Sequence, residues 1–135
     1  MATWDDVRRI VEGLPETSED SRAGGQLSWR VKDKSIAWER PLRKSDLKVL
    51  GDSAPEGEIL GVRVPDLGAK EALLADGSKA IFTIPHFNDY PAVLVLLEQV
   101  EPEELEELIV EAWLCRAPAR LAKAFLDEHG LAGQT

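Results

Sequence analysis

The sequence predicts an α+β fold, in which an N-terminal helix and C-terminal helices pack on an antiparallel β-sheet of about five strands. Both ends of the chain carry apolar residues at helical spacing, whereas short alternating or β-branched segments occupy the middle. Gly, Pro and Asp residues separate these segments. The chain has 135 residues and no segment with linker composition, so we expect a single domain, residues 1–135.

The N-terminal helix is predicted by an apolar face that precedes Gly13 and Pro15. Thr3, followed by Asp6 three residues later, is the expected cap. Residues 16–25 are polar and glycine-rich, so we expect a surface loop there. The apolar face consists of Trp4, Val7, Ile10, Val11 and Leu14.

Five strands are predicted, at residues 27–31, 35–38, 59–64, 80–84 and 92–97. The first two flank a tight turn at 32–34, and their apolar residues alternate with polar ones through Leu27, Trp29, Val31, Ile36 and Trp38. Short helices are expected at residues 45–50, capped by Ser45, and at 67–75, capped by Asp66.

A long helix is predicted from Pro102, because its apolar residues form one stripe and its first turn is rich in glutamate. Pro118 would interrupt that helix and start a second one. The stripe of the first helix is Leu105, Leu108, Ile109, Ala112 and Trp113, and that of the second is Leu121, Ala122, Phe125 and Leu126.

The charge is distributed unevenly. The net charge is -9, which opposes wholesale binding to nucleic acid. The segment 22–48 nevertheless holds eight basic and three acidic residues, a local balance of +5, and the rest of the chain carries -14. Seven of the acidic residues lie between Glu98 and Glu111. One part of the surface is therefore a possible partner for phosphate and another part would repel it.

Several functional classes lack the residues that they need. No apolar run approaches the length of a membrane span, the N-terminus has no secretory signal pattern, and the lone Cys115 cannot form an internal disulfide, so we expect a cytoplasmic protein without a membrane partner. Zinc-ligand spacings, phosphate-binding glycine loops and nucleophile elbows are all missing from the sequence. We therefore expect no metal, no cofactor and no enzymatic activity.

The segment 85–91 is the one polar loop that concentrates groups able to bind a ligand: His86, Asn88, Asp89 and Tyr90. Two interpretations remain open. Pro85, Pro91 and the Asn-Asp pair can simply shape the turn between two strands. Alternatively, the four polar side chains form a ligand site, although no nucleophile or oxyanion donor accompanies them to support catalysis.

Basic residues lie close to Trp29 and Trp38 in the sequence, which is a pattern typical of a surface that holds phosphates and stacks bases. The basic residues concerned are Arg30, Lys32, Lys34, Arg40, Arg43 and Lys44. The alternative interpretation is that both tryptophans belong to the core and that their charged neighbours form the solvated face of a sheet.

Several short motifs together resemble the MmcQ/YjbR family over roughly residues 4–125. They are the turn Gly13–Thr17, the segment Lys34–Pro41, the loop Ile84–Phe87 followed by Tyr90–Val95, and the glutamate-rich helix with Trp113. The resemblance implies an α+β domain similar to type III secretion chaperones and to the double-wing, CyaY-like DNA-binding fold. It implies no catalytic residues.

Two functional hypotheses follow. In the first, an MmcQ/YjbR-like cytoplasmic protein binds DNA weakly through the basic segment 22–48. In the second, the protein is a protein-interaction or chaperone-like module whose sheet or acidic C-terminal helix meets a protein partner, with no role in nucleic-acid binding.

Overall fold

The structure is a computed structural model that describes residues 1–21, 26–55, 57–76 and 78–128. Its centre is a six-stranded sheet in the order β1-β2-β3-β4-β6-β5, in which every neighbouring pair is antiparallel. The α+β class expected from the sequence is confirmed. The strands are β1 (Thr17–Ser21), β2 (Leu27–Val31), β3 (Lys34–Glu39), β4 (Ile59–Arg63), β5 (Ile81–Phe82) and β6 (Ala92–Leu96).

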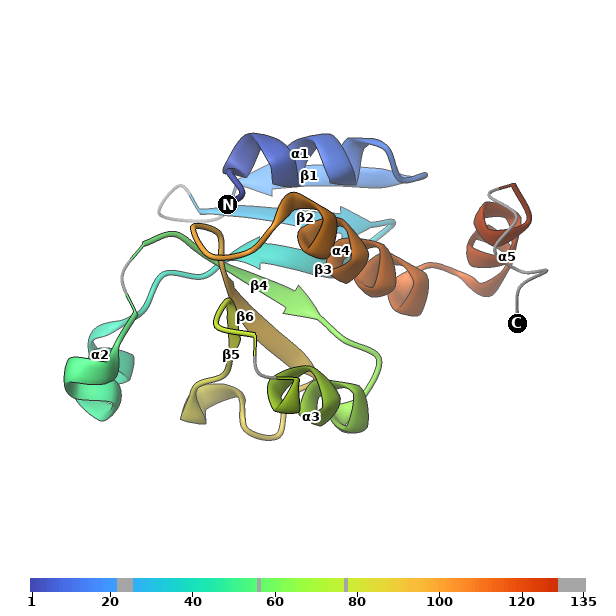
Figure 1. Cartoon of the computed structure of the whole chain (residues 1–135). Coiled ribbons are helices and arrows are strands. Elements are labelled where there is room, and N and C mark those ends of the chain that lie inside the picture. Colours follow the sequence, from blue (N-terminus) through green and yellow to red (C-terminus); the bar gives the residue numbers. More distant parts are fainter. Residues whose placement is uncertain (22–25, 56, 77, 129–135) are drawn as a thin grey trace.

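Two helices, α1 (Trp4–Glu12) and α4 (Pro102–Arg116), lie side by side over one face of this sheet (Figure 1). The short helix α2 (Lys44–Leu50) and the final helix α5 (Ala119–Glu128) lie at opposite ends of the molecule, and α3 (Leu67–Ala75) packs near the β5 end (Figure 1). Two 3₁₀ turns complete the fold, η1 (Gly51–Ser53) and η2 (Pro85–Phe87). Within the described residues, no helix is both long and apolar enough to cross a membrane.

The sheet separates two apolar clusters. The larger one lies under α1 and α4, and includes the fully buried Trp113, whose indole Nε1 donates to Pro15 O at 2.9 Å. The smaller one lies on the other face of the sheet, which we call the open face because neither α1 nor α4 covers it. It consists of Trp38, Ile59, Ile84, Phe87, Ala92 and Leu94.

The segment 16–25 differs from its prediction, because Thr17–Ser21 is the edge strand β1 rather than loop. The strand is polar and mostly exposed, and after Thr17 its sequence has neither the alternation nor the β-branched residues of a typical strand. Pairing with β2 creates it: Arg30 forms an ion pair with Asp20 at 3.1 Å, and Trp29 Nε1 donates to Glu19 at 2.9 Å. Residues 22–25, which include the start of the basic segment, lie outside the described residues.

The β2–β3 hairpin contains a β-bulge that the alternating pattern did not predict. Trp29 is opposite Ala37 and Arg30 is opposite Ser35, so Ile36 has no partner on β2. One extra residue in a strand moves every later side chain to the other face. Trp29 and Ile36 lie in the main core. Trp38, which follows the bulge, lies instead in the cluster on the open face.

Helix α2 begins one residue earlier than predicted, and Ser45 is not its cap. Arg43 occupies the cap position, and its backbone N–H donates to Asp46 Oδ2 at 2.9 Å. Asp46 can satisfy this N–H because it is held in a buried ion pair with Arg40. The cap of α3 is Asp66 as expected, and it accepts from Ala69 N at 2.8 Å.

Candidate functional site

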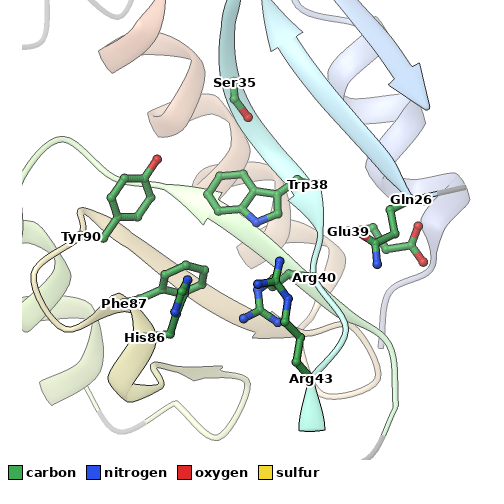
Figure 2. Close-up of a pocket in the computed structure, with 9 residues that line it drawn as sticks. All are labelled: Gln26, Ser35, Trp38, Glu39, Arg40, Arg43, His86, Phe87 and Tyr90. Atoms are coloured by element: carbon green, nitrogen blue, oxygen red, sulfur yellow. The ribbon is translucent and has the colours of Figure 1, made fainter. Parts of the chain in front are cut away.

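The open face carries a pocket of about 370 Å³ at the end of β3. One wall comes from β3 and the chain that follows it, and the opposite wall comes from the loop 85–91 (Figure 2). These two segments were separate candidates in the sequence, and the fold brings part of each to the same place. The lining residues are Gln26, Ser35, Trp38, Glu39, Arg40, Arg43, His86, Phe87 and Tyr90.

Trp38 forms the floor of the pocket. The bulge at Ile36 turns its indole to the open face, and Gly61 on the neighbouring strand provides the space beneath it. Phe87 meets the indole edge to face with the ring centroids 6.4 Å apart, and Tyr90 approaches it at 6.5 Å. Trp38 is 8% exposed, whereas Tyr90 is 41% exposed. The pocket thus has a buried aromatic base and an accessible aromatic rim.

The loop 85–91 is held in place by a buried lysine. Lys70 on α3 donates through Nζ to the backbone carbonyl oxygen of Phe87 and, at 3.0 Å, to that of Tyr90. Burial of the ammonium group lowers the pKa of Lys70, and nearby Asp89 acts in the opposite direction. The two carbonyl contacts fix the backbone on both sides of the Asn88–Asp89 turn.

A buried arginine forms the inner polar wall. Arg40 is 5% exposed, and its guanidinium lies 5.4 Å from the centre of the Phe87 ring. Its Nη1 donates to Pro41 O at 2.5 Å. Its Nη2 is 3.1 Å from Asp46 Oδ2, but has no aligned hydrogen-bond acceptor among the described residues. Arg40 is therefore rigidly held between Pro41, Asp46 and the ring of Phe87.

Asp46 is the counterion of this arginine, and two opposing effects set the pKa of its carboxyl. Burial raises the pKa of Asp46, whereas the hydrogen bond from Arg43 N–H and the charge of Arg40 lower it. The lowering effects prevail, with a smaller contribution from nearby His86. Asp46 is thus an ionised carboxylate that neutralises Arg40 and leaves the pocket without excess charge from this pair.

The positive charge at the mouth of the pocket comes from Arg43. Its side chain is exposed and forms no ion pair with a described residue. Lys44 follows it at the start of α2 and is likewise exposed and unpaired within the described residues. His86 lies across the pocket, with its ring 5.3 Å from that of Phe87 (Figure 2).

The remaining basic candidates lie elsewhere. Lys32 and Lys34 are at the tip of the β2–β3 hairpin, and Lys32 is 3.8 Å from Glu16. Ser35, next to Lys34, lines the pocket, but the six residues of β3 place Lys34 about 20 Å from Arg40 at the other end of the strand, given the rise of a strand. Arg30 is paired with Asp20. The six predicted basic residues therefore form two groups, and only Arg40 and Arg43 line the pocket.

The loop candidates also divide. His86 and Tyr90 line the pocket, whereas Asn88 and Asp89 are exposed and do not line it; Asn88 N donates to Pro85 O within the turn. Arg63 is a neighbouring residue that the sequence analysis missed. Its Nη1 donates to Tyr90 Oη at 3.2 Å, and its guanidinium lies 5.1 Å from the Tyr90 ring. The signal in the sequence that could have indicated Arg63 is that it is the single charged residue of the otherwise apolar strand β4.

Two buried serine hydroxyls lie on the same face as the pocket. Ser28 pairs with Trp38 across the hairpin and Ser35 pairs with Arg30. Neither Oγ has a hydrogen-bond partner among the described residues, although Ser28 is fully buried.

The described residues contain no group of three or more His, Cys, Asp or Glu side chains that could hold a metal ion. The pocket thus offers aromatic and cationic groups, which suit binding to a polar aromatic ligand.

Comparison with known proteins places this chain. The family model named YjbR matches residues 12–115, which is more than half of the chain. The chain belongs to the YjbR family. The matched region includes β3 and the loop 85–91, so the pocket lies within the YjbR domain.

The YjbR assignment agrees with individual relatives. Proteins of Mycobacterium tuberculosis and Mycobacterium bovis that are described as uncharacterised are each 56% identical over 133 residues, covering 96% of this chain and 100% of theirs. A crystal structure of a Deinococcus radiodurans protein with a DUF419 domain has a TM-score of 0.63 and 25% identity. It matches 97% of this chain and 90% of that one.

Proposed function

We propose that this YjbR-family protein binds DNA weakly, with the open-face pocket holding an unpaired base and Arg43 and Lys44 contacting the adjoining phosphates. One observation carries the proposal: an accessible aromatic pocket has unpaired basic side chains at its mouth. Stacking of one base on aromatic side chains contributes about 1–3 kcal/mol, and it needs no particular base.

Charge favours single-stranded DNA over a duplex. The protein as a whole carries a net charge of -9, so a long duplex that spreads across its surface would meet repulsion. A single strand can approach the basic mouth alone and turn a base into the pocket. Lys32 and Lys34 at the hairpin tip lie about 20 Å from Arg40, at the opposite end of β3, and would contact only a longer DNA strand.

The decisive measurement is the fluorescence anisotropy of labelled single- and double-stranded DNA at about 50 mM and about 200 mM salt. We expect micromolar binding of the single strand that weakens as salt rises, and weaker binding of the duplex. An oligonucleotide with abasic sites should bind less tightly, because it lacks the base that occupies the pocket. Absence of binding at the lower salt concentration would overturn the proposal.

A pair of charge-reversal variants locates the surface. Arg43→Glu with Lys44→Glu should reduce single-strand affinity about tenfold at low salt. The slope of log affinity against log salt concentration should fall by about one for each residue changed. The matched control is Arg120→Glu with Lys123→Glu, the same charge change on exposed residues of α5. Equal losses in both variants would show that only overall charge matters.

Tyr90 provides an independent test of stacking. Tyr90→Ala removes the exposed aromatic rim and should weaken single-strand binding while leaving the salt dependence unchanged, since no phosphate contact is lost. Tryptophan fluorescence should also change when DNA binds, because Trp38 forms the floor of the pocket. A variant that binds as tightly as the parent would exclude the pocket as the base site.

We also propose that residues 1–135 act as one domain in the cytoplasm. The presence of a single cysteine, which rules out an intrachain disulfide, supports a reducing compartment. Limited proteolysis should leave one resistant fragment, and cell fractionation should recover the protein with the cytoplasmic contents. Two separately stable fragments, or recovery outside the cytoplasm, would contradict this proposal.

A further inference from the structure

A second hollow lies away from the pocket, between α3 and α4. This groove has a volume of about 380 Å³ and an apolar lining from both helices and from the ends of β4 and β5. Val64, Ile81 and Leu108 at its base belong to the main core. The groove is lined by the apolar residues Val64, Pro65, Ala69, Ala72, Leu73, Ile81 and Leu108 and by the acidic residues Asp76, Glu104, Glu107 and Glu111.

The acidic residues of the groove form no ion pair with a basic side chain in the part of the chain that the structure describes. Glu104, Glu107 and Glu111 lie on successive turns of α4, on the side that faces the groove. Like charges three or four residues apart destabilise a helix by about 0.2–0.5 kcal/mol per pair. This row therefore lowers the stability of the free protein, and a bound cation would relieve it.

The helix dipole does not account for this row. Glutamates in the first turn of a helix are stabilised by its positive end, which explains Glu103 and Glu104. Glu107 and Glu111 lie beyond that turn, and Glu111 is nearer to the C-terminal end, where a negative charge is unfavourable. Their position beside an apolar groove is thus unrelated to helix capping.

Helix α3 leaves apolar surface available on the opposite side. Leu73 is only half-buried and Ala72 is exposed, and both line the groove. An apolar groove between two helices is the usual receptor for the apolar face of a third helix. Acidic residues along its edge select a helix with basic residues beside its apolar stripe, by charge complementarity.

We propose that the α3–α4 groove is a docking site for a basic amphipathic helix of a protein partner. The apolar side chains of that helix occupy the groove over Val64, Leu73 and Leu108. Its lysine or arginine side chains pair with Glu107 and Glu111 on one edge and with Asp76 on the other. This site is separate from the DNA-binding pocket and does not depend on it.

The probe is a labelled synthetic helix of about 15 residues with leucine along one face and lysine beside it. Two control peptides share its length: one has the same composition without an apolar face, and the other has glutamate in place of lysine. Fluorescence anisotropy with the full chain should show saturable binding of the first peptide and much weaker binding of both controls. Equal binding of the first two peptides, or no binding of any, would overturn the proposal.

Charge-reversal variants on one helix test the position of the site. Glu107→Lys with Glu111→Lys should weaken binding of the basic peptide about tenfold, because two favourable ion pairs become repulsive. The matched control is Glu103→Lys with Glu106→Lys, an equal charge change on the same helix at exposed residues outside the groove. Equal losses would mean a general attraction to the acidic surface and would overturn the proposal.

A variant without a charge change tests the groove itself. Ala72 is exposed and lines the groove, so Ala72→Trp should fill it and reduce peptide binding while leaving the folded state and DNA binding unchanged. Circular dichroism checks that α3 persists. Sedimentation of the free protein tests whether a second copy of this chain occupies the groove instead. Self-association that Ala72→Trp abolishes and that the peptide cannot displace would contradict the proposed partner.

Discussion

The indole of Trp38 lies directly against the backbone of Gly61 on the neighbouring strand. A Cβ atom at Gly61 would stand 2.6 Å from Trp38 Cε2 and 2.7 Å from Nε1, well inside van der Waals contact. The two residues are register partners between β3 and β4. Glycine at this position is therefore what allows the large side chain to lie flat on the open face and form the floor of the pocket.

Gly61→Ala should displace Trp38 towards the pocket and destabilise the protein by about 1–3 kcal/mol, because the displaced indole loses its packing against the sheet, Phe87 and Tyr90. Chemical denaturation measures the stability, and the emission maximum of tryptophan reports the displacement. Gly13→Ala is the control, since the nearest atom to its added Cβ would be Ile10 O at 3.4 Å, an ordinary contact. Similar effects of both substitutions would contradict the role assigned to Gly61.

Lys70→Met should destabilise the protein by about 1–3 kcal/mol, because the carbonyl oxygens of Phe87 and Tyr90 lose the ammonium donor and keep only their backbone N–H donors. Hydrogen exchange should increase in residues 85–91. Lys123→Met on α5 removes an exposed lysine and serves as the control. Unchanged exchange in the loop would show that Lys70 does not hold it.

The pH dependence of Lys70 has a definite sign. Burial lowers its pKa in the folded state below the ordinary 10.5, so the unfolded chain binds this proton more readily. The free energy of unfolding should therefore rise, relative to that of Lys70→Met, as pH increases from the lowered pKa towards 10.5. Urea denaturation of both proteins over this range measures the difference. A difference that falls with pH would contradict this assignment.

Asp46→Asn should destabilise the protein by about 3–5 kcal/mol near neutral pH, because it leaves the buried Arg40 without its counterion. The folded-state pKa of Asp46 lies below 3.8, so its stabilising contribution is present above that pH and is lost as pH falls through the folded value. The difference in the free energy of unfolding between Asp46→Asn and the parent protein should therefore narrow in acid, as urea denaturation at several pH values would measure. Asp52→Asn, at an exposed aspartate, should show no such gap.

Trp113→Phe should destabilise the protein by about 1–3 kcal/mol, because the 2.9 Å hydrogen bond from the indole to Pro15 O is lost within the main core. This bond joins α4 to the turn after α1, 98 residues away in the sequence. Hydrogen exchange should increase at the end of α1. A variant with unchanged stability would show that packing alone holds this turn.

Most elements were predictable from local sequence. The capping box of Thr3 and Asp6, the apolar stripe of α4 and the cap of α3 at Asp66 all depend on residues within one or two turns. The strand β1 was not predictable, because Thr17–Ser21 is polar and becomes a strand only through contacts with Arg8, Trp29 and Arg30. An exposed edge strand with charged residues also resists pairing with other chains.

The sequence by itself determined the α+β class, the positions of the helices and the residue types of the candidate site. Only the tertiary structure decided which of those residues meet. A single bulge at Ile36 reverses the face of Trp38, and the antiparallel hairpin carries Lys32 and Lys34 away from Arg43. Alternation along a strand is a local property, whereas register depends on the partner strand, so sequence periodicity could not reveal either outcome.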